Sequence, residues 1–368
     1  MPQLALSSPR VEEEKMQRTS ATSSSAIARG AISNPKNRFD RLEYVPDPEE
    51  DEEPRPVRTQ FLRDASRSII TYNNSPDLGF DASINPYRGC EHGCAYCFAR
   101  PTHEFLGYSA GLDFETKIVV KEDAPELLRA ELSSRRWKPQ VLVMSGVTDC
   151  YQPIERSLEI TRRCLAVMAD FRQPVAVITK NHLVARDIDL LATLAADQAA
   201  MVNISITTLD GELSKTLEPR ASSPSRRLAA VEELSAAGIP VRVLMAPCIP
   251  GLTDHEMPAV FAAAAKAGAC DAGYVPLRLP GAVAPIFENW LDRVVPGQKE
   301  KILQRIRSMR GGKLNDPRFG SRLRGEGFYA TEMRSLYKLS RHKAGFSRVL
   351  PPLSAAAFRI PTDQLSLF

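Results

Sequence analysis

The sequence predicts an α/β fold: a partial TIM-like (β/α)6 barrel with a disordered N-terminal tail and a helical C-terminal extension. From about residue 81, short runs rich in β-branched residues alternate with longer helical patterns, which is typical of βα units around a parallel sheet. Beyond residue 284 the pattern is purely helical, and before residue 61 apolar residues are sparse. A chain of 368 residues is long enough for one large α/β domain with such extensions.

Six runs are predicted to be the strands of the barrel, and four stretches between them to be helices. The run 141–144 is entirely apolar, as expected for a strand buried on both faces. Pro224 stands near a helix start, where a missing N–H costs little, and Gly238 stands where a C-cap belongs. The predicted strands are 83–87, 141–144, 175–179, 201–207, 241–245 and 272–277, and the predicted helices are 154–169, 182–196, 224–237 and 254–267.

The chain is predicted to divide into four parts. Residues 1–60 are expected to be a disordered tail, because their few apolar side chains cannot offset the entropy of ordering. This tail includes an acidic run at 48–54. The other parts are the barrel at 61–283, a basic extension at 284–350 with helices near 285–294, 298–309 and 327–342, and a flexible tail at 351–368.

The composition narrows the class of protein. No apolar run reaches the ~18 residues of a membrane helix, and the N-terminus has no apolar signal-peptide core. Seven cysteines are few for this length, which argues against a disulfide framework. We therefore expect a cytoplasmic protein in a reducing environment, without membrane association.

Cys90, Cys94 and Cys97 follow the spacing C-x3-C-x2-C. Gaps of two and three residues let thiolates converge on one small object, which indicates a metal site. Structural zinc sites usually have four protein ligands, so three cysteines favour a four-iron cluster with one iron open to a small molecule. The alternative is a zinc site completed by His92 or His103.

The cysteine motif, with an aromatic residue on each side of Cys97, resembles that of the radical S-adenosylmethionine (SAM) superfamily. The resemblance implies that Cys90, Cys94 and Cys97 hold a [4Fe-4S] cluster whose open iron chelates SAM. It also implies that one electron cleaves SAM to a 5′-deoxyadenosyl radical, which removes a hydrogen atom from the substrate. Such chemistry needs an external one-electron reductant, such as flavodoxin or ferredoxin. The superfamily's fold is the partial barrel that the alternating pattern predicts.

The loop after the second predicted strand is placed like the glycine-rich SAM motif of the superfamily. A parallel barrel carries its reactive groups at the strand exits. The usual Gly-Gly-Glu is replaced here, and Asp149 is a suitable acceptor for the SAM ammonium group. The alternative, an ordinary N-cap, is compatible with binding. The candidates in this loop are Ser145, Gly146, Thr148 and Asp149.

Later strand exits supply further candidates for SAM binding. Lys180 and Arg220 complement a carboxylate. Ser205 and Thr207 share one face of a strand, where their hydroxyls can contact the ribose or the carboxylate. Ile249 lies in a segment that resembles the superfamily's adenine-contacting segment. The order of these signals after the cysteine motif, more than any one of them, indicates a SAM site.

Within the superfamily, residues 80–290 most resemble the spore photoproduct lyase-like, DNA repair photolyase branch. The resemblance rests on the cysteine motif, Thr148-Asp149, Thr179-Lys180, the Leu-Glu-Pro-Arg segment at 217–220 and the segment 247–254 after the fifth predicted strand. It implies that Cys150 is a catalytic hydrogen donor and Tyr96 a radical relay. Phe98 stands where the lyase has a second tyrosine. The alternative for Cys150 is a small packing thiol.

Two features of the C-terminal part predict macromolecular partners. Residues 291–350 hold 15 Lys and Arg against 5 Asp and Glu, with interleaved aromatics, which predicts a nucleic-acid surface. The alternative is a solvated charged face. The last residues resemble the pentapeptide that binds the bacterial sliding clamp, and two apolar anchors of about 1.5–3 kcal/mol each predict a weak contact. This motif comprises Gln364, Leu365, Leu367 and Phe368.

The leading hypothesis is a radical SAM enzyme, lyase-like or hydrogen-abstracting, that acts on nucleic acid in DNA repair. A second hypothesis keeps the radical chemistry and changes the substrate to RNA or protein. A third, from another class, is a non-catalytic, metal-stabilised adaptor that docks on the clamp.

Overall fold

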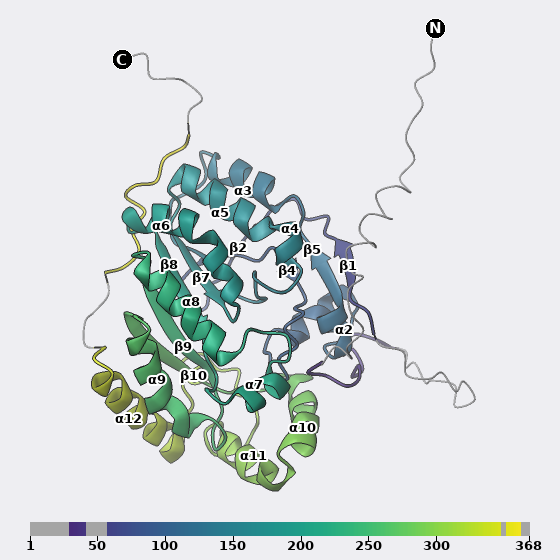
Figure 1. Cartoon of the computed structure of the whole chain (residues 1–368). Helices are drawn as coiled ribbons and strands as arrows, with labels where there is room; N and C mark the ends of the chain where they lie inside the picture. The colour runs from purple at the N-terminus through teal and green to yellow at the C-terminus, as the bar shows by residue number, and fades with distance from the viewer. Residues whose placement is uncertain (1–28, 42–56, 347–350, 362–368) are drawn as a thin grey trace, which may run out of the picture.

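The computed structural model describes residues 29–41, 57–346 and 351–361 (Figure 1). Within them, a seven-stranded sheet has the order β10-β9-β8-β7-β6-β3-β2, in which β2 alone runs antiparallel to its neighbour. The six parallel strands confirm the predicted partial barrel. The strands are β2 (Ile70–Tyr72), β3 (Ala82–Ile84), β6 (Leu142–Met144), β7 (Val175–Thr179), β8 (Ala200–Ser205), β9 (Val241–Cys248) and β10 (Asp271–Pro276).

Helices cover the outer face of the sheet (Figure 1). In α5 (Ile160–Phe171) the buried side chains recur at three- and four-residue steps, which forms an apolar stripe that faces the core. The same packing places the other outer helices, α3 (Ala124–Leu132), α6 (Ile188–Ala196), α8 (Pro224–Ala236) and α9 (Met257–Lys266). The exits of the six parallel strands therefore meet at one end of the barrel, away from the starts of these strands.

Several predicted elements differ in detail. The predicted strand 83–87 is divided between β3 and β4 (Tyr87–Arg88), since Pro86 has no N–H for the ladder. The predicted helix 154–169 is interrupted at Glu159, whose φ of 50° ends α4 (Glu155–Leu158) before α5 begins. Two more predicted helices open with 3-10 turns, η2 (His182–Asp187) and η3 (Asp254–Glu256).

A small second sheet was not predicted. Its order is β1-β5-β4, with β1 (Gln60–Arg63) parallel to β5 (Lys117–Val120) and β4 antiparallel to β5. Two short helices, η1 (Arg100–Leu106) and α2 (Leu112–Thr116), come between β4 and β5 in the chain. A third, α7 (Gly211–Leu217), follows β8 of the barrel. This sheet positions the chain on both sides of the cysteine motif.

Part of the expected disordered tail lies against the body of the protein. The Glu115 carboxylate accepts the backbone N–H groups of Gly30 at 3.1 Å and Ala31 at 2.8 Å. These bonds fix the position of residues 29–31, which corrects the expectation for this stretch. The acidic run at 48–54 lies outside the described residues.

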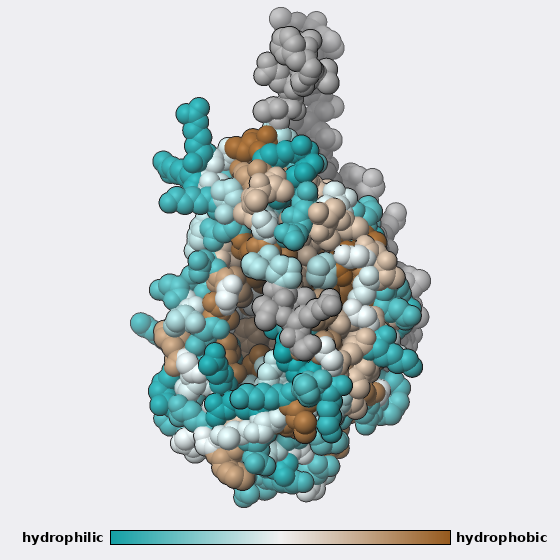
Figure 2. Space-filling view, turned by 90° about the vertical axis from the view of Figure 1, so that its left-hand side faces the viewer, coloured by the Kyte–Doolittle hydropathy of each residue, from teal (hydrophilic) through white to brown (hydrophobic). Residues whose placement is uncertain are grey.

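The C-terminal extension is helical, as the sequence pattern indicates. It comprises α10 (Val283–Val294), η4 (Pro296–Gln298), α11 (Lys299–Ser308) and α12 (Gly327–Lys343). Stacked rings of Phe287 and Trp290, 5.6 Å apart, anchor α10, and Tyr337 holds α12 edge-on to Phe261 of α9. The side of the molecule seen in Figure 2 is mostly hydrophilic, with apolar residues in separate spots. None of the helices in the described ranges is both long and apolar enough to span a bilayer.

Candidate functional site

The cysteine loop, residues 88–99, is held in shape by a buried ion pair. Arg100 donates to the Cys94 carbonyl from Nε at 3.0 Å and from Nη2 at 2.9 Å. Arg100 also contacts Glu115 Oε1 at 2.6 Å, and neither side chain is exposed. The Cys90 N–H donates to the Phe114 carbonyl at 2.9 Å. The backbone around the thiols is thereby fixed by residues outside the loop.

Glycine is required where the N-terminal segment crosses the cysteine loop. Gly93 has a φ of 66°, and a Cβ there would lie 2.7 Å from Glu115 Oε2. A Cβ on Gly30 would lie 1.7 Å from the Gly93 carbonyl oxygen. The two backbones can approach this closely only without side chains.

The three thiols of the loop lie near one another and are mostly buried. Cys90 and Cys94 are each 7% exposed. Burial raises the pKa of all three thiols, and the neighbouring thiols raise the pKa of Cys90 further. Across the residues that the structure describes, no group of three or more His, Cys, Asp or Glu side chains is arranged to hold one metal ion. In the absence of a bound metal, burial therefore favours the protonated form of the three thiols.

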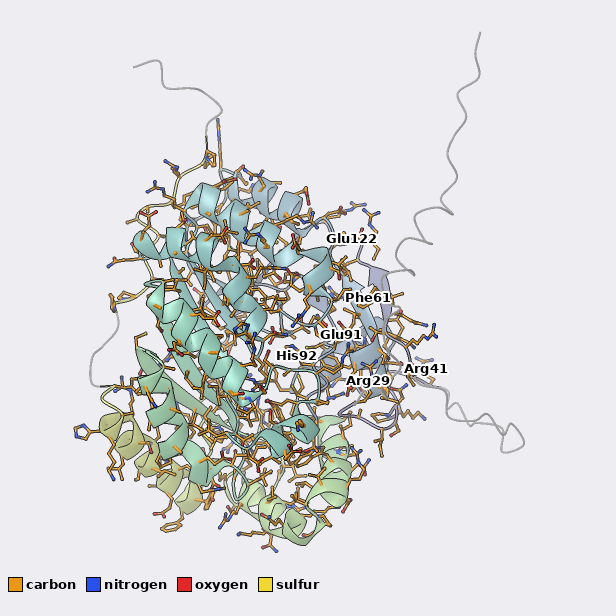
Figure 3. All side chains as sticks on the ribbon, viewed as in Figure 1. Arg29, Arg41, Phe61, Glu91, His92 and Glu122 are labelled. Carbon is orange, nitrogen blue, oxygen red and sulfur yellow. The ribbon has the colours of Figure 1, made fainter. Side chains whose placement is uncertain are left out.

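The cysteine loop touches the exits of β6 and β7 through His92 (Figure 3). His92 Nδ1 lies 3.4 Å from Asp149 Oδ2, and its Nε2 lies 3.3 Å from the Asn181 amide nitrogen. Asp149 also accepts the Thr179 hydroxyl at 2.7 Å and the Lys180 N–H at 2.8 Å. Burial alone would raise the pKa of Asp149, but His92 and these donors outweigh it and lower that pKa.

A second buried network joins the loop to the exit of β8. The Tyr96 hydroxyl donates to Glu218, which also accepts the Thr207 hydroxyl at 2.8 Å and pairs with Arg227. Burial raises the Glu218 pKa, yet Arg227 and Lys180 overcome it and lower that pKa to about 2. Burial, then Cys94 and Glu218, raise the pKa of Tyr96.

Two of these residues were missed by sequence reasoning. Glu218 lies in the Leu-Glu-Pro-Arg segment at 217–220, of which only Arg220 was predicted from the sequence as a candidate for SAM binding. Arg227 lies nine positions further along, in α8, and gives no local signal. Its Nη1 also donates to the Ser205 carbonyl at 3.0 Å, so Ser205 meets this network through its backbone.

The predicted cationic residues lie beside carboxylates of the site. Lys180 Nζ donates to the Ala246 carbonyl at 3.0 Å and lies 3.8 Å from Glu218 Oε1. Arg220 Nη1 lies 2.8 Å from Glu91 Oε1 as an ion pair without hydrogen-bond geometry. The Arg220 N–H donates to the His92 carbonyl at 3.2 Å. Both cations therefore border the cysteine loop.

The loop after β6 has an unusual backbone at Ser145. Its φ is 74°, and its hydroxyl accepts the Cys150 N–H at 2.7 Å across Gly146 and the following turn. Thr148 donates from its hydroxyl to the Tyr87 carbonyl at 2.6 Å. At the exit of β9, Ile249 is buried in the apolar group that includes Cys94 and Tyr96. The structure thus brings the exits of β6, β7, β8 and β9 to the cysteine loop.

Comparison with known proteins identifies the family. The model of the radical SAM superfamily matches residues 84–264, a span that holds the cysteine loop and the strand exits just described.

The chain belongs to the radical SAM superfamily.

Relatives of this radical SAM protein occur in bacteria and archaea. An uncharacterized protein of Mycobacterium tuberculosis is 33% identical over 298 residues, which cover 80% of this chain and 84% of the relative. One of Methanocaldococcus jannaschii is 34% identical over 173 residues, 47% of this chain and 62% of the relative.

Solved structures of spore photoproduct lyase share the fold of this radical SAM protein. The lyase complexed with dinucleoside spore photoproduct has a TM-score of 0.57 and 16% identity, and the match covers 77% of this chain and 79% of that one. A point mutant of the lyase has a TM-score of 0.56 at 16% identity, over 78% and 79% of the chains. Radical SAM proteins use a [4Fe-4S] cluster and SAM.

The donor set of the radical SAM loop fits such a cluster. Soft thiolates are the ligands of iron–sulfur clusters, and bound metal displaces the thiol protons that burial otherwise retains. The three thiols come from one short loop whose backbone is fixed by Arg100.

Cys150, the predicted hydrogen donor, is fully buried in the main apolar core. Its carbonyl accepts the Thr161 hydroxyl at 2.8 Å, and burial followed by Asp149 raises the pKa of its thiol. The catalytic role of Cys150 stays a prediction.

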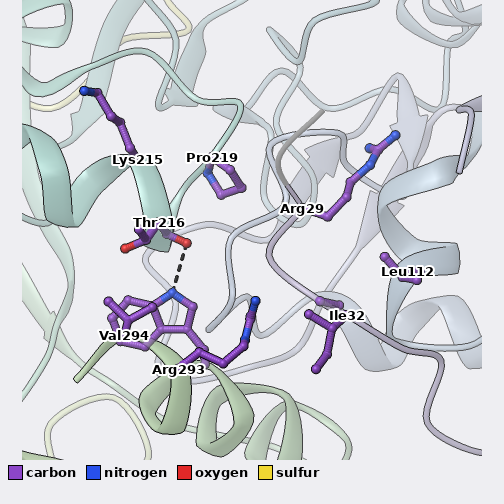
Figure 4. Close-up of a pocket in the computed structure, with 10 residues that line it drawn as sticks. Arg29, Ile32, Leu112, Lys215, Thr216, Pro219, Arg293 and Val294 are labelled. Atoms are coloured by element: carbon purple, nitrogen blue, oxygen red, sulfur yellow. Dashed lines mark hydrogen bonds between the residues drawn. The ribbon is translucent and has the colours of Figure 1, made fainter. Parts of the chain in front are cut away.

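A cavity of about 500 Å³ lies beside the N-terminal segment (Figure 4). Arg29 and Arg293 line it, together with Trp290, whose Nε1 donates to the Thr216 carbonyl at 2.9 Å. None of the residues predicted to bind SAM is in its lining. The cavity approaches the candidate site at Pro219, which lies between Glu218 and Arg220.

Proposed function

We propose that this protein is a radical SAM enzyme that acts on nucleic acid, with a [4Fe-4S] cluster held by Cys90, Cys94 and Cys97. When bound with SAM, that cluster supplies the electron that cleaves SAM to a 5′-deoxyadenosyl radical. The observation that carries the proposal is the meeting of the cysteine loop with four strand exits, through His92, Tyr96 and Ile249. The electron comes from an external reductant such as flavodoxin or ferredoxin.

The residues proposed to bind SAM have different tasks. Lys180 is 14% exposed and can turn its ammonium group from the Ala246 carbonyl to a bound carboxylate. Asp149 holds the exits of β6 and β7 together, and its remaining lone pairs suit an ammonium group. Glu218 fixes Tyr96 and Thr207, and Arg220 supports the loop. Ser145, Gly146, Thr148, Ser205 and Ile249 complete the proposed set.

Two observations support nucleic acid as the substrate class. The lyase that shares this fold was solved with a dinucleoside photoproduct. The basic extension reaches the rim of the barrel, because Arg322 pairs with Asp77 at 2.6 Å. A lyase-like repair reaction is therefore favoured, with Cys150 returning a hydrogen atom and Tyr96 as a relay. An unchanged product yield in Cys150→Ala would remove the role of that thiol.

Anaerobic reconstitution tests the enzymatic proposal. We expect brown protein absorbing near 400 nm, with release of 5′-deoxyadenosine from SAM and dithionite. Each of the alanine variants of Cys90, Cys94 and Cys97 should lose the bound iron and this product. Cys270→Ala is the control, because its thiol bonds only the Val241 carbonyl, at 3.0 Å. Bound zinc in place of iron, with no SAM cleavage, would support the adaptor hypothesis instead.

The sliding clamp is a proposed partner through Gln364–Phe368, which lies outside the described residues. Deletion of 364–368 should abolish retention on immobilised clamp, while the activity on a free oligonucleotide stays. Equal retention of both proteins would contradict the proposal.

A further inference from the structure

We propose that Arg278 and Phe98 form a nucleotide subsite at the rim of the barrel, where Arg278 binds a phosphate of the substrate strand and Phe98 stacks on a base. The inference rests on the proposed action on nucleic acid and locates the substrate. Neither residue was among the candidates taken from the sequence.

Arg278 is a cation that forms no ion pair within the part of the chain that the structure describes, and the charge of Asp77 acts on it only from beyond ion-pair distance. It follows the exit of β10 by two residues and is half-buried. No hydrogen bond or ion pair joins its side chain to a described residue, and its guanidinium lies 5.0 Å from the centroid of the Phe98 ring. Burial, and then Arg322, lower the pKa of Arg278. A half-buried charge without a partner is costly, and a bound anion would remove that cost.

The surroundings of Arg278 add positive charge. Arg310 is buried, and it donates only to backbone carbonyls: Leu277 at 2.7 Å, Pro276 at 3.2 Å and Arg322 at 3.0 Å. The carbonyls of Pro276 and Leu277 directly precede Arg278, so Arg310 is held beside it. Burial and then Arg278 lower the pKa of Arg310 to about 10.

The carboxylates whose charges act on Arg278 and Arg310, Asp77 and Asp316, are engaged by other groups. Asp77 accepts Arg322 Nε and the Gly320 N–H, both at 2.6 Å. Asp316 accepts Arg318 Nη2 at 2.8 Å and the Ser321 hydroxyl at 2.7 Å. Neither carboxylate makes an ion pair with Arg278, so the site is suited to an anion from outside the chain.

Phe98 supplies the flat apolar surface of the subsite. It follows Cys97 directly, and it is 46% exposed. A second exposed ring, Phe319, lies under the Arg322 guanidinium at 4.5 Å on the same rim. Arginine over an exposed aromatic ring is a usual combination for single-stranded or unstacked nucleotides, since the ring stacks on bases and the cation binds phosphate.

The position of the subsite suits a substrate that must reach the cysteine loop. β10 is one edge of the open barrel, and Ser75 and Asp77 follow β2, the other edge. Arg322 bonds to both of those residues, and its carbonyl accepts Arg310, which also donates to the Leu277 carbonyl after β10, so the extension links the edges. A base on Phe98 would lie one residue from the proposed cluster ligand Cys97. Chemistry on a base requires such an unstacked position.

The test measures binding by full-length, anaerobically reconstituted protein. A fluorescein-labelled single strand of about 12 nucleotides, as DNA and as RNA, is titrated by anisotropy between about 50 and 200 mM salt. Arg278→Gln should weaken binding about tenfold and reduce the salt slope by about 0.7, the value for one phosphate contact. Arg278→Lys should restore the slope. Phe98→Ala should weaken binding about tenfold with the slope unchanged.

Lys266→Gln is the matched control, because it removes one exposed positive charge at the end of α9, at the opposite end of the barrel. Its affinity and slope should equal those of the wild type. Wild-type affinity and slope in Arg278→Gln would overturn the subsite alone. A wild-type protein that binds neither strand would overturn the subsite and the proposed function together. Arg278→Gln should be at least as stable to urea as the wild type, since Arg278 has no described hydrogen bond or ion pair to lose and its half-buried charge is costly.

Discussion

At the scale of single residues, Glu218 has the greatest influence on the interior of the site. It is fully buried, and it accepts bonds from Tyr96, Thr207 and Arg227. Its pKa of about 2 is below the ordinary 4.5, so the folded protein binds fewer protons there than the unfolded chain. The stability that Glu218 contributes is therefore complete above about pH 4.5 and is lost as the pH falls toward 2.

Glu218→Gln should lower the free energy of unfolding by about 3–5 kcal/mol at pH 7, because the buried Arg227 loses its counter-charge. Urea unfolding measures this change, and repetition between pH 4.5 and 2 should give a flatter pH dependence than the wild type. Glu212→Gln is the control, since its side chain is 84% exposed and pairs only at the surface. Equal stability of Glu218→Gln and the wild type would contradict this account.

At the scale of elements, the crossing of the N-terminal segment over the cysteine loop is the decisive contact. Gly30 lies against the Gly93 carbonyl, while Glu115 binds residues 30 and 31 and pairs with Arg100. Through Arg100, the same carboxylate fixes the Cys94 carbonyl. The N-terminal segment and the cysteine backbone are thus coupled.

Gly30→Ala should displace this segment and weaken the loop, since its new methyl group would occupy the position of the Gly93 oxygen. We expect iron to leave the reconstituted protein about tenfold faster when a chelator is added. Gly297→Ala is the matched control, because nothing lies within 4 Å of a Cβ at that position. Equal rates of iron loss in the two variants would show that the segment does not support the loop.

Elements with strong periodicity could be predicted from the sequence, and those fixed by distant partners could not. The barrel could be predicted because apolar side chains recur regularly along its strands and helices, as in the run at 141–144 and in the helix predicted at 154–169. The small sheet was missed, since β1 and β5 are short and their partners lie far apart in the chain. Glu218 was missed for the same reason: its partner Tyr96 is 122 positions away. The cysteine loop was recognised because its spacing is local.

At the scale of the whole molecule, the open barrel brings together the cysteine loop and the C-terminal extension. The cysteine loop covers the exits of β6 to β9, and the C-terminal extension joins the two edges of the sheet through Arg322 and Asp77. Four basic residues of the extension pair with carboxylates of the described fold: Lys299, Arg318, Arg322 and Arg341. The proposed recognition of nucleic acid would use cations that have no such pair, among which Arg278 is the one beside the cysteine loop.

We propose that a radical formed at this site removes hydrogen from nucleic acid. The most direct measurement is deuterium transfer from deuterated oligonucleotides into 5′-deoxyadenosine, followed by mass spectrometry under anaerobic turnover. We expect deuterium in 5′-deoxyadenosine with at least one DNA or RNA strand, and none with Cys94→Ala. Efficient SAM cleavage without deuterium from any labelled position of DNA or RNA, but with transfer from a deuterated protein or peptide, would contradict it.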